Sequence, residues 1–80
     1  MNKRDFADYV MNQLKHRHYG GETQERIIGW MNDFAQNQDE ISERTGDSSC
    51  SDNANLLRLM RDAYLSDGMR GCRKVLRESL

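Results

Sequence analysis

The hydrophobic pattern of residues 23–44 constrains the fold more than any other feature of this sequence. At about 100° per residue, apolar side chains gather on one side of a helix: Ile27, Ile28, Trp30, Met31, Phe34 and Ile41. Acidic side chains gather on the opposite side: Glu22, Glu25, Asp33, Asp39, Glu40 and Glu43. This separation predicts a long amphipathic helix with one buried face. Thr23 or Glu22 can cap its start, and the glycine at 46 ends it.

Three further segments show helical spacing. The first covers about residues 3–18, the third about 53–65 and the fourth about 69–79. We expect residues 46–53 to form a polar loop and residues 66–68 to break the helix before the fourth segment. The chain has no proline and lacks runs of Val, Ile and Thr. The sequence therefore predicts an all-α fold, a small bundle of three to four helices with the long amphipathic helix as its spine.

Size and charge limit the classes of protein that this chain can belong to. Eighty residues make at most one helical domain, over 1–80, with only a few kcal/mol of net stability. Packing against a second copy would add to that stability, so a homodimer is one expected form. The formal net charge of −1 excludes a strongly basic body that binds nucleic acid without specificity.

The sequence also bears on the compartment. No stretch approaches the apolar length needed to cross a bilayer, so we expect no membrane partner. Lys3 and Arg4 are not followed by an apolar run, which is not the pattern of a signal peptide. Cys50 and Cys72 have no metal-binding spacing, and we expect reduced thiols in a cytoplasmic protein. The alternative is a disulfide bond between these two cysteines.

The charges are unevenly distributed along the chain. Residues 22–52 contain eight acidic and two basic side chains. Four of the acidic side chains are candidates for binding a protein partner and are called the acidic face below: Glu25, Asp39, Glu40 and Glu43. The fourth segment carries basic residues at i, i+3, i+4 and i+7, called the basic stripe: Arg70, Arg73, Lys74 and Arg77. This stripe is expected to be solvated or neutralised by the acidic helix, with an acidic partner protein or nucleic-acid phosphate as alternatives.

The aromatic residues allow two interpretations. Five lie on apolar faces by spacing, which predicts core packing: Phe6, Tyr9, Trp30, Phe34 and Tyr64. Tyr19, beside the glycine pair, is the exception. The alternative is that part of the wide apolar face, particularly Trp30 and Phe34, binds a partner, because tryptophan and tyrosine are enriched at interface hot spots. Leu65 points about 180° from Leu56 on the helical wheel and is a candidate exposed apolar contact.

Residues that could carry chemistry do not form a recognisable site. His16 and His18 project about 200° apart on a helix, so they do not grip one metal ion and are expected at the surface. Cys50 and the neighbouring serines have no activating group beside them in the sequence. We therefore expect no enzyme activity, no cofactor and no metal site.

These observations favour a non-catalytic protein-binding module, an adaptor, inhibitor or regulator that acts through helical faces on a partner protein that the sequence does not identify. Small accessory proteins of bacteria, plasmids and phages often have this size and composition. The alternative is a DNA-binding transcriptional regulator that uses the basic stripe. The third and fourth segments, joined at residues 66–68, resemble a helix-turn-helix. However, Lys74 and Arg77 occupy positions that are usually apolar in that family.

Overall fold

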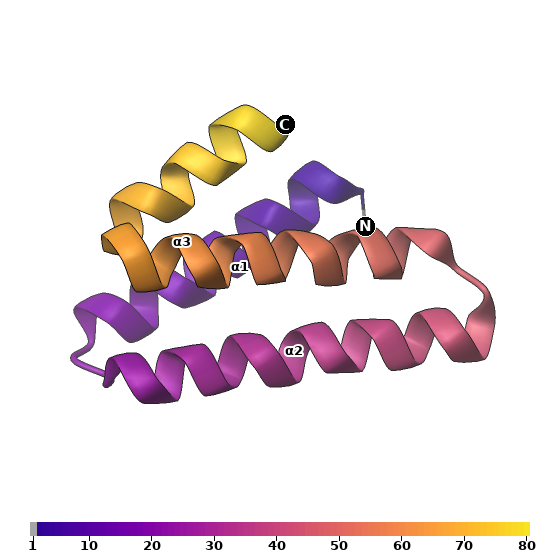
Figure 1. Ribbon diagram of the computed structural model, residues 1–80, viewed down its shortest axis with the longest axis horizontal. Helices are drawn as coiled ribbons and strands as arrows, with labels where there is room; N and C mark the ends of the chain where they lie inside the picture. Colours follow the sequence, from indigo (N-terminus) through magenta and orange to yellow (C-terminus); the bar gives the residue numbers. More distant parts are fainter. Residues whose placement is uncertain (1) are drawn as a thin grey trace.

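The computed structural model describes residues 2–80, which form three α-helices and no strand (Figure 1). The helix α1 spans Lys3–Tyr19, α2 spans Gln24–Thr45 and α3 spans Ser48–Ser79. The predicted all-α class is confirmed. Within residues 2–80, none of the helices has both the length and the apolar character that crossing a membrane requires.

Short polar side chains and glycines set the helix ends. The Asn2 side chain accepts a hydrogen bond from the Asp5 backbone N–H at 2.8 Å and caps α1. Thr23, one of the two predicted caps, accepts from the Arg26 N–H at 3.3 Å and starts α2. Gly46 ends α2 in the left-handed conformation, with φ 72°, which glycine adopts without steric cost.

The start of α3 differs from the prediction. The polar loop expected over residues 46–53 is reduced to Gly46 and Asp47, and the helix begins at Ser48. The Asp47 side chain accepts from the Ser49 N–H at 3.0 Å and satisfies one of the free donors of the first turn. Serine and aspartate favour loops and helix starts for the same reason, since their short side chains bind nearby backbone N–H groups.

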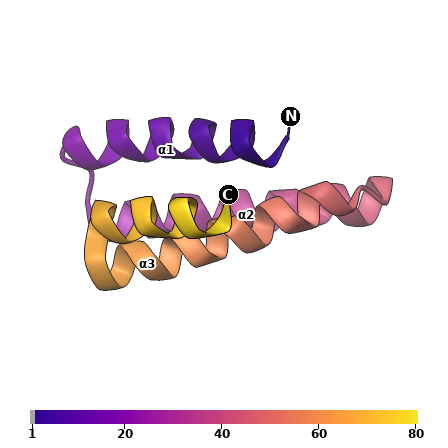
Figure 2. The ribbon, with the colours of Figure 1, turned by 90° about the horizontal axis from the view of Figure 1, so that it is seen from above.

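The predicted break at residues 66–68 is confirmed. Asp67 (φ −145°, ψ 16°) and Gly68 (φ 58°, ψ −144°) leave helical geometry inside α3. A positive φ combined with this ψ is open only to glycine, so Gly68 permits the sharp change of direction. The chain then turns back, and residues 69–79, here called the C-terminal segment, run beside the first part of α3 toward the side where α1 begins (Figures 1 and 2).

The three helices are packed unequally. The long helix α2 runs antiparallel to the first part of α3 and packs mainly on it, whereas α1 lies across one face of the α2–α3 pair and contacts α2 least (Figure 2). The fully buried side chains come from all three helices: Val10, Leu14, Ile27, Met31, Leu56, Leu57, Met60 and Cys72. The end where α2 joins α3 extends beyond both α1 and the C-terminal segment in both views. The molecule therefore has a closed end and an open end.

Two residues that the helical spacing placed in the core are exposed. Tyr9 is 46% exposed and Leu59 is 53% exposed. Each lies three residues from a core residue, Phe6 and Leu56 respectively, so it is turned about 60° to one side of the buried stripe. That offset is enough to leave a side chain outside the core where no further helix covers it. Trp30 and Phe34 are half-buried and pack against the core from its edge.

Candidate partner-binding surface

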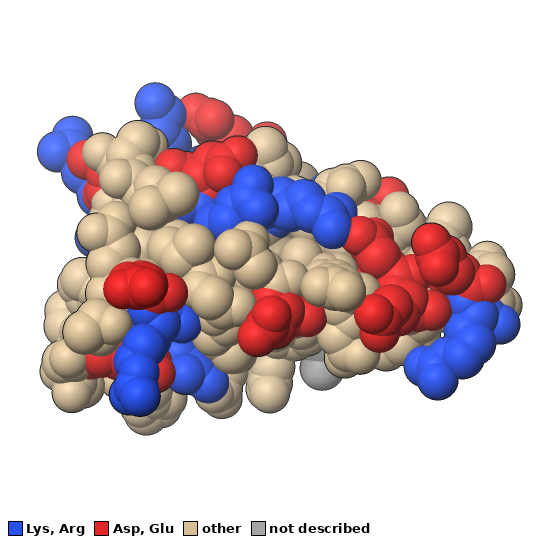
Figure 3. All heavy atoms as spheres, turned by 60° about the horizontal axis from the view of Figure 1, so that its bottom comes forward, with Lys and Arg blue, Asp and Glu red and all other residues tan. Residues whose placement is uncertain are grey.

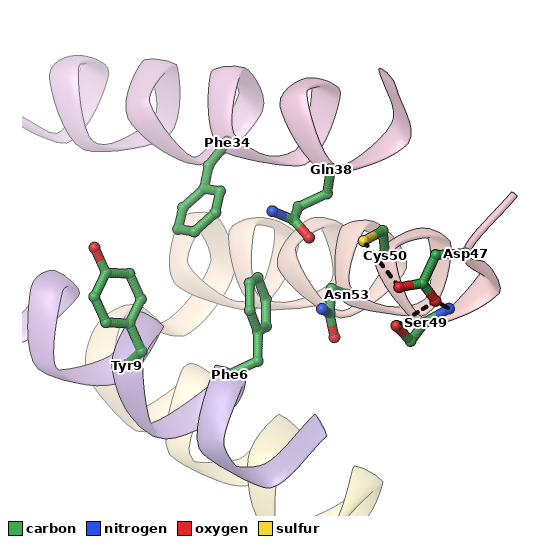
Figure 4. A pocket seen from close by; sticks show the side chains of 8 residues that line it. All are labelled: Phe6, Tyr9, Phe34, Gln38, Asp47, Ser49, Cys50 and Asn53. Atoms are coloured by element: carbon green, nitrogen blue, oxygen red, sulfur yellow. Dashed lines mark hydrogen bonds between the residues drawn. The ribbon is translucent and has the colours of Figure 1, made fainter. Parts of the chain in front are cut away.

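A hollow of about 300 Å³ lies at the open end, where the first part of α1 faces the α2–α3 connection (Figure 4). We call it the aromatic hollow, and its lining residues come from all three helices: Phe6, Tyr9, Phe34, Gln38, Asp47, Ser49, Cys50 and Asn53. The Phe6 and Phe34 rings reach toward each other from α1 and α2, with Tyr9 beside them. Polar side chains from α2 and α3 form the other half of the lining.

The aromatic rings form a continuous row between α1 and α2. Phe34 stands edge-on to Phe6 and to Tyr9, with ring centroids 5.4 Å and 6.2 Å away, and Trp30 follows at 6.0 Å. Arg17 ends the row, with its guanidinium carbon 4.5 Å from the centre of the Trp30 ring. Phe6 is buried while Tyr9 and Phe34 keep exposed surface, so the row is open mainly at the hollow.

The two amides in the hollow make no hydrogen bond within residues 2–80. Asn53 is only 7% exposed, and its side chain makes no hydrogen bond to any residue in 2–80. The half-buried Gln38 side chain is also without a partner over this range and extends from α2 toward α3 beside it (Figure 4). Buried amides are normally hydrogen-bonded, so both are available to a molecule that enters the hollow.

Asp47 supplies negative charge at the mouth of the hollow. Its carboxylate accepts from the Ser49 hydroxyl at 2.7 Å and from the Ser49 backbone N–H at 3.0 Å, while the Cys50 thiol lies 3.9 Å away. The hydrogen bonds from the Ser49 hydroxyl and N–H hold the pKa of Asp47 below its ordinary value of 3.8. The carboxylate is therefore ionised at neutral pH and keeps lone pairs for a further donor.

The acidic face lies mostly on the outer side of α2. Glu40 follows Gln38 by two residues, so it points to the opposite side of the helix from the hollow. Figure 3 shows acidic side chains gathered toward the end of the molecule where α2 finishes. Asp39 is half-buried and forms an ion pair with Arg58 of α3, whereas Glu25 and Glu43 are exposed. Of the four predicted residues, Asp39 is thus the one that forms an ion pair within the described chain.

The basic stripe is fully exposed on the C-terminal segment. Arg70 lies 4.0 Å from Asp67, and no ion pair within residues 2–80 includes Arg73, Lys74 or Arg77. The stripe is solvated in this chain, which is one of the states predicted for it, and the acidic helix α2 instead pairs its Asp39 with Arg58. The structure does not bring the stripe and the acidic face together.

The three residues of the candidate apolar interface, Trp30, Phe34 and Leu65, lie at different places on the surface. Phe34 lines the aromatic hollow, while Trp30 is covered on one side by Arg17, which also binds Glu22 at 3.0 Å. Leu65 is 52% exposed, as predicted, but it lines a separate shallow depression beside His18. Of the three residues, only Phe34 belongs to the aromatic hollow.

His18 differs from the prediction that both histidines lie at the surface. Its Nδ1 is 2.8 Å from the hydroxyl of Tyr64, and the two rings stand edge-on at 5.7 Å, so the contact ties α1 to α3. Desolvation and the nearby Cys72 thiol raise the pKa of Tyr64. Within residues 2–80, no three His, Cys, Asp or Glu side chains form a group that could hold a metal ion.

The two cysteines are free, and the alternative of a disulfide bond between them is not realised. The Cys72 thiol is buried and donates to the Met60 carbonyl oxygen at 3.2 Å. Met60 follows Cys50 by ten residues in α3, so Cys72 lies beside a part of the helix that is about 15 Å from Cys50. Burial raises the pKa of Cys72 to about 11. Cys72 is therefore an inert core residue, whereas Cys50 is partly exposed in the aromatic hollow.

Sequence reasoning missed the polar half of the hollow. Asn53 precedes Leu56 and Leu57 by three and four residues, which places it on the buried side once the helix extends back to Ser48. With the helix start placed at Asn53 itself, that signal is lost. Comparisons of this chain with known protein families, curated proteins and solved structures found no match.

Proposed function

We propose that this chain is a non-catalytic protein-binding module that contacts its partner through the aromatic hollow. One observation carries the proposal. At the open end, aromatic rings that are only partly covered stand beside two amides that make no hydrogen bond within the described residues. Everywhere in a stable core such groups are covered or hydrogen-bonded, so this combination is typical of a surface that is completed by another molecule.

A protein partner fits the hollow better than a metabolite does. Its volume is at the lower limit of small-molecule sites, and it opens widely to solvent instead of enclosing a ligand. Aromatic side chains and amides are also the groups that contribute most to protein interfaces. We assign no catalytic step to Ser49 or Cys50, because the Asp47 carboxylate that contacts them serves as the cap of α3.

The test compares two exposed tyrosines on α1. Tyr9 lines the hollow, and Tyr19 is 70% exposed outside it, so Tyr9→Ser and Tyr19→Ser remove similar side chains from different places. Tagged wild-type protein and each variant are used to capture partners from host extract. We expect Tyr9→Ser to lose the captured protein by tenfold or more, a loss of about 1.4 kcal/mol or more, and Tyr19→Ser to retain it. Equal capture by both variants would refute the proposed site.

The DNA-binding alternative is supported by the exposure of all four side chains of the basic stripe. Phosphate contacts by Arg73 and Lys74 would make binding fall steeply with salt concentration. Retention on duplex DNA at low salt that disappears in an Arg73→Ala, Lys74→Ala double variant would favour this function. We place the protein in the cytoplasm, a proposal supported by the two free cysteines. A mass measurement in solution decides whether it is a homodimer.

A further inference from the structure

We infer that the aromatic hollow receives one large aromatic side chain from a basic segment of the partner protein, with a neighbouring Lys or Arg placed against Asp47. This inference rests on the proposed function and specifies the chemistry of the partner. It is carried by three features of the hollow, namely its size and lining, its two amides and its charge.

The size and lining of the hollow fit a single aromatic ring. A space of about 300 Å³ is large enough for one aromatic side chain, since a cavity of about 150 Å³ can hold benzene. Phe6 and Phe34 already stand edge-on at 5.4 Å, and Tyr9 and Phe34 do so at 6.2 Å. A further ring would extend the same edge-to-face arrangement, which favours aromatic over aliphatic occupants.

The amides of Gln38 and Asn53 supply the polar contacts. Both a donor and an acceptor are available on each, and neither is used within residues 2–80. The Asn53 residue is 7% exposed, and its amide atoms open to the hollow, where a peptide group or an indole N–H from an incoming segment can bind them. These groups therefore select a residue presented on a peptide backbone over a purely apolar ligand.

The charge of the open end selects a basic segment. Asp47 is the charged residue among those described that line the hollow, and its negative charge exceeds the partial positive charge of about one half at the start of α3. Asp39 is neutralised by Arg58 and Glu40 points away from the hollow, so Asp47 alone provides its negative charge among the residues described. A Lys or Arg next to the aromatic anchor is attracted to this end, and a Glu or Asp is repelled.

The experiment uses three blocked dipeptides as probes: acetyl-Trp-Lys-amide, acetyl-Trp-Glu-amide and acetyl-Ala-Lys-amide. Each is titrated into the full chain labelled with ¹⁵N, and the side-chain NH₂ signals of Gln38 and Asn53 are followed by NMR. We expect Trp-Lys to shift these signals with a Kd of about 1 mM and to bind about fivefold more tightly than Trp-Glu. The Ala-Lys probe should leave both signals in place.

Variants separate the contributions of shape and charge. Gln38→Ala should weaken Trp-Lys binding severalfold, whereas Asn37→Ala, the adjacent exposed residue outside the hollow, should not. Asp47→Asn retains a good helix cap and removes the charge, so it should abolish the preference for Trp-Lys over Trp-Glu and leave indole binding intact. Thermal unfolding of each variant confirms that the fold is unchanged.

Several outcomes would overturn the inference. One is that the probes shift only NMR signals of residues in the depression beside Leu65. Another is that the wild-type protein binds Trp-Lys and Trp-Glu with equal affinity. A third is that no signal shifts at about 10 mM probe. Self-association that Tyr9→Ser abolishes would assign the hollow to a second copy instead. The proposed function fails separately, when Tyr9→Ser captures the natural partner as well as wild type does. If that variant loses the partner while the probes do not bind, only the partner chemistry is wrong.

Discussion

The two ends of the molecule are built from similar side chains, but these side chains are buried and hydrogen-bonded to different degrees. At the closed end, Leu14, Ile27 and Leu57 are fully buried, and the Cys72 thiol finds a carbonyl partner. At the open end, Tyr9 is nearly half exposed, and the Asn53 amide has no hydrogen bond to any of residues 2–80. The difference arises because α1 and the C-terminal segment stop before the α2–α3 hairpin does (Figure 2). It indicates that the closed end holds the fold and the open end is shaped for binding.

The largest effect is expected at the closed end. Leu57 is fully buried, so Leu57→Ala removes apolar contacts, leaves a cavity and should lower the free energy of unfolding by about 2–5 kcal/mol. Leu65→Ala, at a residue that is 52% exposed, is the control and should change it by less than about 0.5 kcal/mol. Urea denaturation followed by circular dichroism measures both. Similar losses for the two leucines would contradict the assignment of Leu57 to the core and Leu65 to the surface.

The turn that folds the C-terminal segment back comes next in size. Gly68→Ala introduces a side chain where φ is 58° and ψ is −144°, so we expect a loss of about 1–3 kcal/mol from backbone strain alone. A Cβ at this position meets no atom within 4 Å, which rules out a clash as the cause. Gly29→Ala, inside α2 with similar open space, should instead stabilise by about 0.5–1 kcal/mol. Thermal unfolding of both variants tests the pair.

At the open end, the account predicts a gain of stability from a substitution that harms binding. Asn53 is 7% exposed and its amide makes no hydrogen bond within residues 2–80, so Asn53→Leu, with an apolar side chain of similar shape, should raise the free energy of unfolding by about 1 kcal/mol. The same variant should lose binding of acetyl-Trp-Lys-amide. Asn55→Leu, exposed on the same helix, should change stability by less than about 0.5 kcal/mol. Destabilisation by Asn53→Leu would mean that the Asn53 amide already makes favourable polar contacts in the free protein.

The smallest effect concerns pH. The pKa of Asp47 in the folded protein is below 3.8, so its contribution to stability is complete above pH 3.8 and is lost as pH falls through the folded pKa. Asp47→Asn does not titrate and should make the stability less dependent on pH in that acidic range. The readout is the unfolding midpoint between about pH 2 and 6, the range in which carboxylates titrate. An unchanged slope in the variant would show that the Ser49 hydrogen bonds do not favour the ionised form.

The sequence predicts most of the fold because its strongest signals are local. The bounds of α1 and α2 follow from apolar spacing, from Thr23 and from glycines that end each helix, and these predictions agree with the structure to within about one residue. The break at Asp67 and Gly68 is likewise a local signal. The start of α3 is not, since the same serines and aspartates are typical of a loop and of a first helical turn.

The candidate site depends on where helices stop relative to one another, which local patterns do not contain. Phe34 was predicted to be a contact residue from its chemistry, and it does line the hollow. Gln38 and Asn53 become candidates only when the structure shows that both line the hollow. Tyr9 fits the apolar spacing of α1 and is exposed because α1 contacts α2 so little. Spacing determines the direction of a side chain but not whether a neighbour is present there.

The central claim is that the partner covers the aromatic hollow, and Cys50 reports on this directly because its thiol is partly exposed there. Cys72 does not interfere, since it is buried and its pKa is raised to about 11. The measurement is the rate of Cys50 alkylation by iodoacetamide in the free protein and in the complex with the captured partner. We expect the partner to slow the reaction by about tenfold or more, the ratio that corresponds to 1.4 kcal/mol of protection. An unchanged rate in a saturated complex would show that the partner binds elsewhere.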